Sequence, residues 1–501
     1  MQRARWLLSS LSIFACAGDS PEPAFSPIER TLAELRAQID DGTSCRAIVR
    51  AYAQLHAERD PELRAFVTWN EAAAADAERL DAVPAGERGP LHCAPIVVKD
   101  NIDVAGLPTT GGVRALARSV PGEHAVIVAR LVDAGAVVLG KTNMPDFALD
   151  GVNTLSSARG QTDNPYAAGV TVYGSSGGTA AALAASLGVV GLGTDTFGSL
   201  VQPASATGLV AIRPTQGLVS GAGVLPLMSL QDTPGPMARN VADAAALLAV
   251  IADGPAGEAY TRALDPDGLV GLTIGFDPLA LQAVPLLGLT PDPEVADLFT
   301  ASLAAIEQAG ATTLAVEVLA PQFASLQAAV DGSFACMPVD FKQSLDAYLA
   351  ALGPAAPRHD LAEILATGEF LPSVQDFVAG AAAQTDSIAA SAACTGYQSA
   401  RQAAQAGIVG LMDDRGLDLL VYPAANQPPF AAGAAPPAGW YGFQALSSPT
   451  GLPSLSLPMG LTARGGLPVG LILLARPGAE ALLIQAAFAL EQRQAPRVPP
   501  P

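Results

Sequence analysis

Two segments rich in glycine and serine contain the residues best suited to chemistry. One is GSSGGT at 174–179, which precedes an alanine-rich segment, and the other is GTDTFGS at 193–199, which follows an apolar run. Both lie where a strand is expected to pass into a helix, so successive backbone N–H groups point outward and can hold an anion. This arrangement suits either phosphate binding or an oxyanion hole, the set of donors that stabilises a negatively charged intermediate.

Lysine is rare in this chain, and each retained lysine is therefore informative. Only Lys99, Lys141 and Lys342 occur among 27 basic residues. Arginine has evidently taken most positions where either residue would serve. Lys99 ends the apolar segment 94–98, which has the composition of a buried strand.

The order and spacing of several independent motifs resemble the amidase signature family. The resemblance covers nearly everything after about residue 29 and rests on PIVVKDN at 95–101, GKTN at 140–143, the two segments above, AIRPT at 211–215, QDTPGPMAR at 231–239, GLP at 451–453 and GLPVG at 466–470. The segments 161–165 and 231–236 are similar to the bacterial peptide-amidase-like branch. Motif matches of this kind are hypotheses about a site until geometry supports them.

The resemblance implies a role for each polar residue in these motifs. Ser199 would be the nucleophile, Ser175 a bridging serine that follows a cis peptide bond, and Lys99 the general base. Ser176 and Asp195 would support this triad from behind, and Ser176 in particular would help to orient Lys99. The resemblance implies no metal or cofactor, and it places the oxyanion hole at the backbone N–H groups of Ser199 and its neighbours Thr196, Phe197 and Gly198.

These implied roles are chemically consistent. A serine hydroxyl becomes a good nucleophile only when a neighbour takes its proton. Lysine can do so only as a neutral amine, so burial and nearby donors must lower the pKa of Lys99 from its ordinary value of about 10.4. Arginine cannot serve, because its pKa exceeds about 12. The expected activity is hydrolysis of small carboxamides, peptide C-terminal amides or aryl amides through an acyl-enzyme.

The sequence departs from the family at two positions near the nucleophile. Phe197 stands where most relatives have glycine, and Val201 stands where most have arginine. Backbone donors survive a change of side chain, so these departures leave the chemistry possible. They put the substrate specificity in doubt, because Phe197 can narrow the pocket.

Other interpretations of the same residues remain open. Ser175, Ser176 and Ser199 could be plain helix caps. GSSGG also satisfies G-x-S-x-G, which would make Ser176 the nucleophile of an α/β-hydrolase with His359, the only downstream histidine. The glycine intervals do not fit dinucleotide binding. Two further alternatives are an amidase-fold binding protein without turnover and a subunit of a glutamine amidotransferase.

The spacing of apolar residues predicts the elements that must position these segments. Helices are expected over about 29–58, 124–134, 180–187, 293–309 and 480–491, with Asp60 and Pro61 ending the first. Strands are expected over 94–98, 136–139, 188–193, 272–276, 312–318, 419–421, 454–457 and 469–474. With the resemblance, this alternation predicts an α/β fold: a large mixed sheet covered by helices on both faces. We expect a leader or linker over 1–28 and one domain over 29–495, with variable, substrate-facing elements at about 320–440.

The N-terminal residues resemble an export signal. Arg3 and Arg5 precede a short apolar run and Cys16, in a context similar to a degraded lipobox. This pattern predicts an exported protein, periplasmic or anchored by a lipid on Cys16; the alternative is a disordered apolar N-terminus on a cytoplasmic protein. The remaining cysteines, Cys45, Cys93, Cys336 and Cys394, allow three disulfide pairings or could be buried free thiols.

Composition limits the class of partner. The formal net charge is −20, without acidic runs, and half of the residues are hydrophobic. A diffuse negative field of this kind excludes a nucleic-acid partner and is typical of a globular protein. The expected partner is a small-molecule or peptide amide substrate, bound by a monomer or homodimer.

Overall fold

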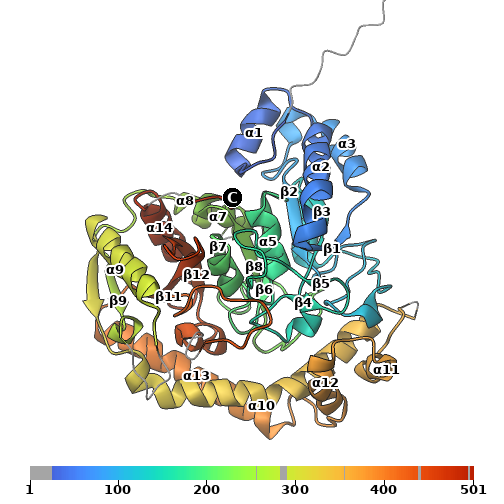
Figure 1. The fold of residues 1–501 in the computed structure, drawn as a ribbon. Coiled ribbons are helices and arrows are strands. Elements are labelled where there is room, and N and C mark those ends of the chain that lie inside the picture. The colour runs from blue at the N-terminus through green and yellow to red at the C-terminus, as the bar shows by residue number, and fades with distance from the viewer. Residues whose placement is uncertain (1–24, 255–256, 283–289, 355, 438–441, 495–496) are drawn as a thin grey trace, which may run out of the picture.

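A mixed β-sheet forms the centre of the molecule (Figure 1). The computed structural model describes residues 25–254, 257–282, 290–354, 356–437, 442–494 and 497–501. Within these residues eleven strands pair in the order β1-β3-β2-β6-β8-β7-β12-β13-β11-β9-β10. Their bounds are β1 Phe66–Trp69, β2 Pro95–Lys99, β3 Val137–Thr142, β6 Val190–Asp195, β7 Val210–Arg213, β8 Thr233–Ala238, β9 Thr273–Phe276, β10 Thr312–Ala315, β11 Leu419–Pro423, β12 Ser454–Leu461 and β13 Pro468–Leu474. A separate hairpin joins β4 Leu155–Ser156 to β5 Gly160–Gln161.

Parallel and antiparallel pairs alternate in blocks across this sheet. β2 pairs in parallel with β3 and β6, and β9 pairs in parallel with β10 and β11. The strands between these blocks are antiparallel. The sheet is therefore mixed, as expected.

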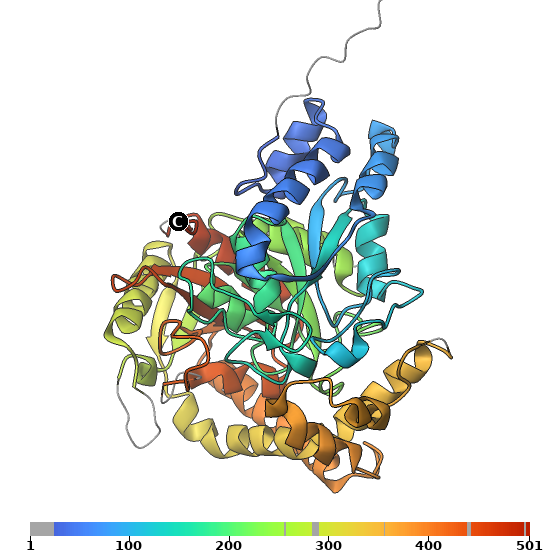
Figure 2. The same cartoon turned by 45° about the vertical axis from the view of Figure 1, so that its right-hand side comes forward.

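Helices cover both faces of the sheet and extend along one end of the molecule (Figures 1 and 2). Their bounds are α1 Leu32–Asp40, α2 Cys45–Leu63, α3 Ala73–Asp81, α4 Val126–Asp133, α5 Gly177–Ala184, α6 Val201–Ala206, α7 Val241–Ile251, α8 Gly257–Arg262, α9 Pro293–Gln308, α10 Leu319–Ala351, α11 Leu361–Thr367, α12 Gln375–Ala382, α13 Ala392–Asp414 and α14 Glu480–Glu491. Short 3₁₀ turns are η1 Ala85–Glu87, η2 Arg114–Leu116, η3 Asp146–Ala148, η4 Pro278–Ala280, η6 Pro372–Val374, η7 Gly442–Leu446 and η8 Ser448–Thr450. The expected fold class is confirmed.

The first predicted helix is wrong in two respects. It is divided into α1 and α2, because Gly42 adopts a positive φ of 102° and the Ser44 side chain caps the new helix at Ala47 N. Pro61 does not end α2, which continues to Leu63. Arg64 ends it instead, in a left-handed conformation with φ 54°. A proline keeps a helical φ, so it can lie in a last turn when a later residue ends the helix.

The apolar core has two main parts. The larger part packs on the sheet, and a second cluster joins α10, α11, α12 and α13 to the chain around Phe147 and Met228. The region at about 320–440, which has little sequence periodicity, thus forms a layer of helices with its own core. α10 runs along the lower edge of the molecule in Figures 1 and 2.

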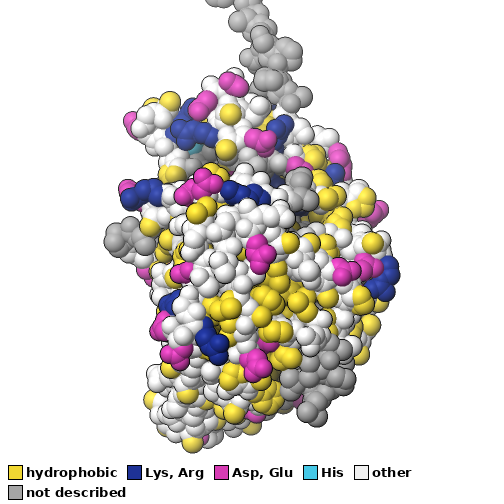
Figure 3. Space-filling view, turned by 90° about the vertical axis from the view of Figure 1, so that its left-hand side faces the viewer, with side chains coloured by type: hydrophobic (Ala, Val, Ile, Leu, Met, Phe, Trp, Pro, Cys, Tyr) yellow, Lys and Arg dark blue, Asp and Glu magenta, His cyan; other side chains and the backbone are white. Residues whose placement is uncertain are grey.

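The cysteines and the surface complete the description. Cys45 pairs with Cys93, and Cys336 pairs with Cys394, which selects one of the three pairings. Cys16 and the rest of the expected leader up to residue 24 lie outside the described residues. None of the described helices combines the length and the apolar character needed to cross a bilayer. Figure 3 shows acidic and basic side chains intermixed on one face, with apolar side chains gathered at its lower right.

Candidate active site

The predicted site residues lie at the ends of two adjacent parallel strands. β2 ends at Lys99 and β6 ends at Asp195, and these strands are paired in parallel. The carboxyl ends of parallel strands form the edge of a sheet where ligands bind in α/β proteins. This edge places Lys99 beside the loop 196–199.

The amine of Lys99 is buried and has three close oxygen neighbours. Nζ lies 2.7 Å from Ser175 Oγ, 2.8 Å from Thr194 Oγ1 and 3.3 Å from the Thr194 carbonyl oxygen. Burial lowers the pKa of Lys99 to about 7, although the negative charges of Asp232 and Asp195 oppose this shift. A neutral amine has two N–H groups and one lone pair. When both N–H groups donate to Thr194, the lone pair can accept the proton of the Ser175 hydroxyl.

The segment before α5 supplies the two adjacent serines. The peptide bond between Gly174 and Ser175 is cis, as the resemblance implied. Ser176 occupies the N-cap position of α5, but its side chain makes no capping hydrogen bond. It instead donates to the Thr194 carbonyl at 3.1 Å and accepts from Thr194 N at 3.3 Å. Ser176 therefore acts on Lys99 only through Thr194, and the interpretation of Ser176 as a helix cap is wrong.

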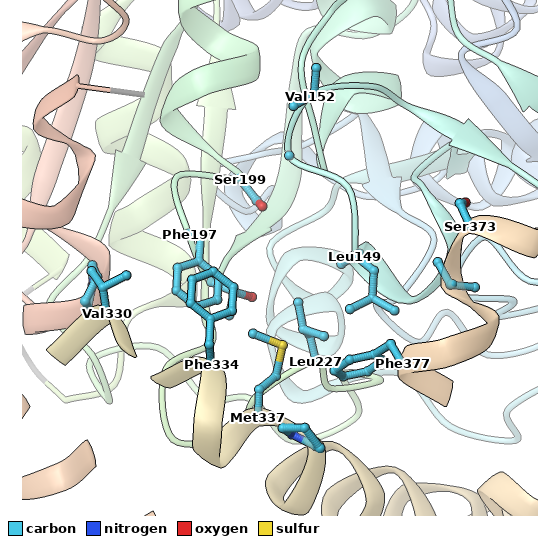
Figure 4. Close-up of a pocket in the computed structure, with 16 residues that line it drawn as sticks. Leu149, Val152, Phe197, Ser199, Leu227, Val330, Phe334, Met337, Ser373 and Phe377 are labelled. Atoms are coloured by element: carbon cyan, nitrogen blue, oxygen red, sulfur yellow. The ribbon is translucent and has the colours of Figure 1, made fainter. Parts of the chain in front are cut away.

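Ser199 lies between this segment and an open cavity. Its carbonyl accepts from Ser176 N at 3.2 Å, and its hydroxyl points toward the cavity in Figure 4. In the described part of the chain no hydrogen bond joins the hydroxyls of Ser175 and Ser199. Catalytic hydrogen bonds are often long in unliganded enzymes and shorten when substrate binds.

The loop that ends at Ser199 is held by one buried carboxylate. Asp195 accepts from Gly198 N at 2.9 Å, from Leu200 N at 2.9 Å and from Ser448 Oγ at 2.8 Å. Arg213, which is also fully buried, donates to Asp195 from Nε at 3.1 Å. This ion pair compensates the buried charge of Asp195 and fixes the loop from behind.

Gly198 differs from the expectation for the oxyanion hole. Its N–H donates to Asp195 and, at 3.0 Å, to Ser448 Oγ. Because this donor already has two acceptors, it is not available to an oxygen in the cavity. Thr196, Phe197 and Ser199 line the cavity, whereas Gly198 does not.

The cavity beside Ser199 has a volume of about 570 Å³ and an apolar wall (Figure 4). Phe197 and Phe334 stack on one side of it, and Leu149 and Phe377 lie across from them. All 16 residues that line it are uncharged, and none is a histidine. The cavity therefore suits an apolar ligand without a formal charge.

Sequence reasoning missed several residues that hold the site. Thr194 and Arg213 belong to the quoted motifs, so their positions gave a signal that was not used. Asp232, in the QDT motif, accepts from Thr196 Oγ1 at 2.6 Å, and burial raises the pKa of Asp232 to about 6. Ser448 gave no signal, because it lies in no motif and meets Asp195 only through the fold.

The alternative pair of Ser176 and His359 is not brought together. The Ser176 hydroxyl is engaged with Thr194, and His359 is exposed on another part of the molecule beside Glu363. The other buried lysine, Lys141, bonds to Thr109 and lies 3.4 Å from Asp100, away from the cavity lining.

One group of side chains has the residue types of a metal site. Potential ligand atoms of Cys45, His92 and Cys93 lie within 4.8 Å of one another. The two thiols are joined to each other in the structure, so they are not available as thiolate ligands.

Comparisons with known proteins agree with this geometry. The family model described as Amidase matches residues 47–484. A glutamyl-tRNA(Gln) amidotransferase subunit from Synechococcus sp. (strain CC9605) is 35% identical, over 93% of this chain and 96% of that protein. The solved peptide amidase of Stenotrophomonas maltophilia is 34% identical with a TM-score of 0.83, and the match covers 96% of this chain and 99% of that one. A structure of a peptide amidase with the competitive inhibitor chymostatin is 35% identical with a TM-score of 0.83, covering 95% of this chain and 99% of that one.

The family match spans most of the chain, and the relatives are covered almost completely. The resemblance carried by the motifs is thereby confirmed. The chain belongs to the amidase family and is an enzyme that acts on carbon–nitrogen amide bonds.

Proposed function

We propose that this protein hydrolyses uncharged carboxamides, including peptide C-terminal amides, with Ser199 as nucleophile, Ser175 as proton bridge and Lys99 as general base. The observation that carries the proposal is the buried amine of Lys99, 2.7 Å from Ser175 Oγ, behind a serine that lines the cavity. A lysine with its pKa lowered to about 7 is largely neutral at and above neutral pH.

The proposed reaction proceeds in two steps. Ser199 Oγ bonds to the amide carbon while its proton passes to Ser175, and the Ser175 proton passes to Lys99 Nζ. The C–N bond then breaks, and the amine leaves with the proton returned through Ser175. Water attacks the acyl-enzyme, the proton moves along the same path, and the acid leaves as Ser199 regains its hydrogen. The backbone N–H groups of Thr196, Phe197 and Ser199 are the proposed oxyanion donors.

The cavity distinguishes this activity from transamidation with free glutamine. Several relatives bear the name of the amidotransferase just described. Free glutamine carries an ammonium and a carboxylate, and burial of such charges requires charged or strongly polar partners. Because none of the lining residues is charged, the cavity favours a hydrolase for neutral amides.

The test is chemical labelling followed by turnover assays. A fluorophosphonate should modify Ser199 alone, and Ser199→Ala should reduce amide hydrolysis by about 10³-fold or more. His359→Ala should leave turnover unchanged. Labelling at Ser176, or turnover that survives Ser199→Ala, would contradict the proposal. A folded protein that binds amides without labelling or turnover would instead be a binding protein.

We also propose that the protein works in an oxidising compartment. Two disulfides join all four cysteines of the described residues, and disulfides persist mainly outside the cytoplasm. This agrees with the expectation that 1–28 includes an export signal. A lipid on Cys16 remains a proposal, which mass spectrometry of the mature N-terminus tests.

A further inference from the structure

Two phenyl rings form one wall of the cavity beside Ser199. Phe197 and Phe334 stack with ring centroids 4.9 Å apart and planes 5° apart. Phe334 is 58% exposed, although α10 buries many other apolar side chains. An apolar ring left in this position gains little from folding and remains available to a ligand.

The position of Phe334 is fixed by contacts on both sides of it along α10. Gly332 packs closely against the backbone of Tyr397 on α13, where an added Cβ would lie 3.1 Å from Tyr397 Cα. Cys336, just beyond Phe334, is joined to Cys394 on the same partner helix. α10 is thus attached to α13 before and after Phe334, while Phe334 itself faces the cavity (Figure 4). A wall held in this way is preorganised for binding.

We infer that Phe197 and Phe334 form a recognition site for an aromatic ring in the acyl part of the substrate. The inference rests on the proposed function and names the substrate class: uncharged amides whose acyl group carries a phenyl or similar ring. Aromatic rings prefer offset or edge-to-face contacts, which the exposed part of Phe334 offers from the cavity side. Leu149 and Phe377 close the opposite side of the same space.

The matched control lies on the same helix. Phe323 also belongs to α10 and is 51% exposed, but it does not line the cavity. Phe334→Ala and Phe323→Ala therefore remove the same side chain, with similar exposure, from the same element. Phe197 is a poorer target, because it belongs to the loop of Ser199.

The experiment compares acetamide, 3-phenylpropionamide and the charged amide succinamate. The unaltered enzyme should prefer 3-phenylpropionamide and should not accept succinamate. Phe334→Ala should lower kcat/KM for 3-phenylpropionamide about tenfold, mainly through KM, and should leave acetamide unchanged. Phe323→Ala should change neither. An equal loss on both neutral amides, or no preference in the unaltered enzyme, overturns the inference.

A binding measurement separates this inference from the proposed function. Calorimetric titration of 3-phenylpropionamide into Ser199→Ala reports recognition without turnover. Phe334→Ala in that background should weaken binding about tenfold. Unchanged binding overturns the inference even when amides are hydrolysed. Weakened binding without any hydrolysis by the unaltered chain supports the inference and contradicts the proposed catalytic role of Ser199.

Discussion

The environment of Lys99 determines how the proposed reaction depends on pH. Burial lowers the pKa of this amine to about 7, and only its neutral form can take a proton from Ser175. The protonated form dominates below this pKa, so activity must fall as the pH decreases. We therefore expect kcat/KM to rise with pH and to reach half of its plateau near pH 7.

A pH–rate profile between pH 5 and 9 measures this midpoint, with stability checked across the range. Lys99→Arg serves as the control, because a guanidinium stays protonated throughout and should reduce turnover by about 10³-fold at every pH. Constant activity between pH 5 and 9 would contradict the role of Lys99 as base.

Asp232 is expected to adjust this midpoint. Its negative charge raises the pKa of Lys99, and with its own pKa at about 6 it is mostly ionised at pH 7. Asp232→Asn removes the charge but keeps an oxygen that can accept from Thr196. The Lys99 pKa should then decrease, and the rising limb of the pH–rate profile should move to lower pH.

Asp346→Asn is a suitable control, because Asp346 pairs with Lys342 on α10 outside the cavity lining. This substitution should leave the limb in place. A shift of the Asp232→Asn profile to higher pH would show that the coupling has the opposite sign.

At the scale of elements, the close approach of α5 to its neighbours places Ser175 and Ser176. An ideal Cβ on Gly178, in the first turn of α5, would lie 2.3 Å from Asn143 O and 2.8 Å from Ala65 O. Both are backbone atoms, which cannot move aside as a flexible side chain can. α5 can therefore lie this close to β3 only with glycine at 178.

Gly178→Ala should displace α5 and lower both stability and activity. Overpacking of this kind costs about 1–3 kcal/mol, and rigid backbone neighbours favour the upper end. Gly410→Ala in α13 is the matched control, because nothing lies within 4 Å of its ideal Cβ. The control should gain up to about 1 kcal/mol from helix propensity. Thermal unfolding of both variants checks the two signs.

For the whole molecule, the disulfides link parts of the chain that support the site. Cys45–Cys93 joins the start of α2 to the segment before β2, and Cys336–Cys394 joins α10 to α13. Their sequence separations are 48 and 58 residues. In the chain-entropy model, loops of this length each contribute about 4 kcal/mol by restricting the unfolded chain.

Reduction should therefore lower the unfolding midpoint strongly. The measurement is thermal unfolding with and without a reductant, on protein kept oxidised during purification. Maleimide labelling in denaturant provides the control: none of Cys45, Cys93, Cys336 and Cys394 should react before reduction, and all four should react after it. Labelling before reduction would contradict the proposed oxidising compartment.

The sequence by itself was enough to identify the family and the principal elements around the site. β2, α5 and β6 lie close to their predicted ranges, because strong apolar runs followed by glycine-rich turns define strand ends locally. Lys99, Ser175 and Ser199 could be named because they lie in such local motifs. The need for a lowered Lys99 pKa also followed from the residue type alone.

Only the tertiary structure decided which distant residues complete the site. Ser448 meets Asp195 across 253 residues of chain, and the ring of Phe334 meets Phe197 from a helix with little sequence periodicity. The two acceptors of Gly198 N–H and the pairing of the cysteines depend on the same kind of long-range contact. Local periodicity reports which face of an element is buried, but it does not report which other element covers that face. For that reason the motifs predicted the reaction, and the packing of α10 and η8 determined the shape of the site.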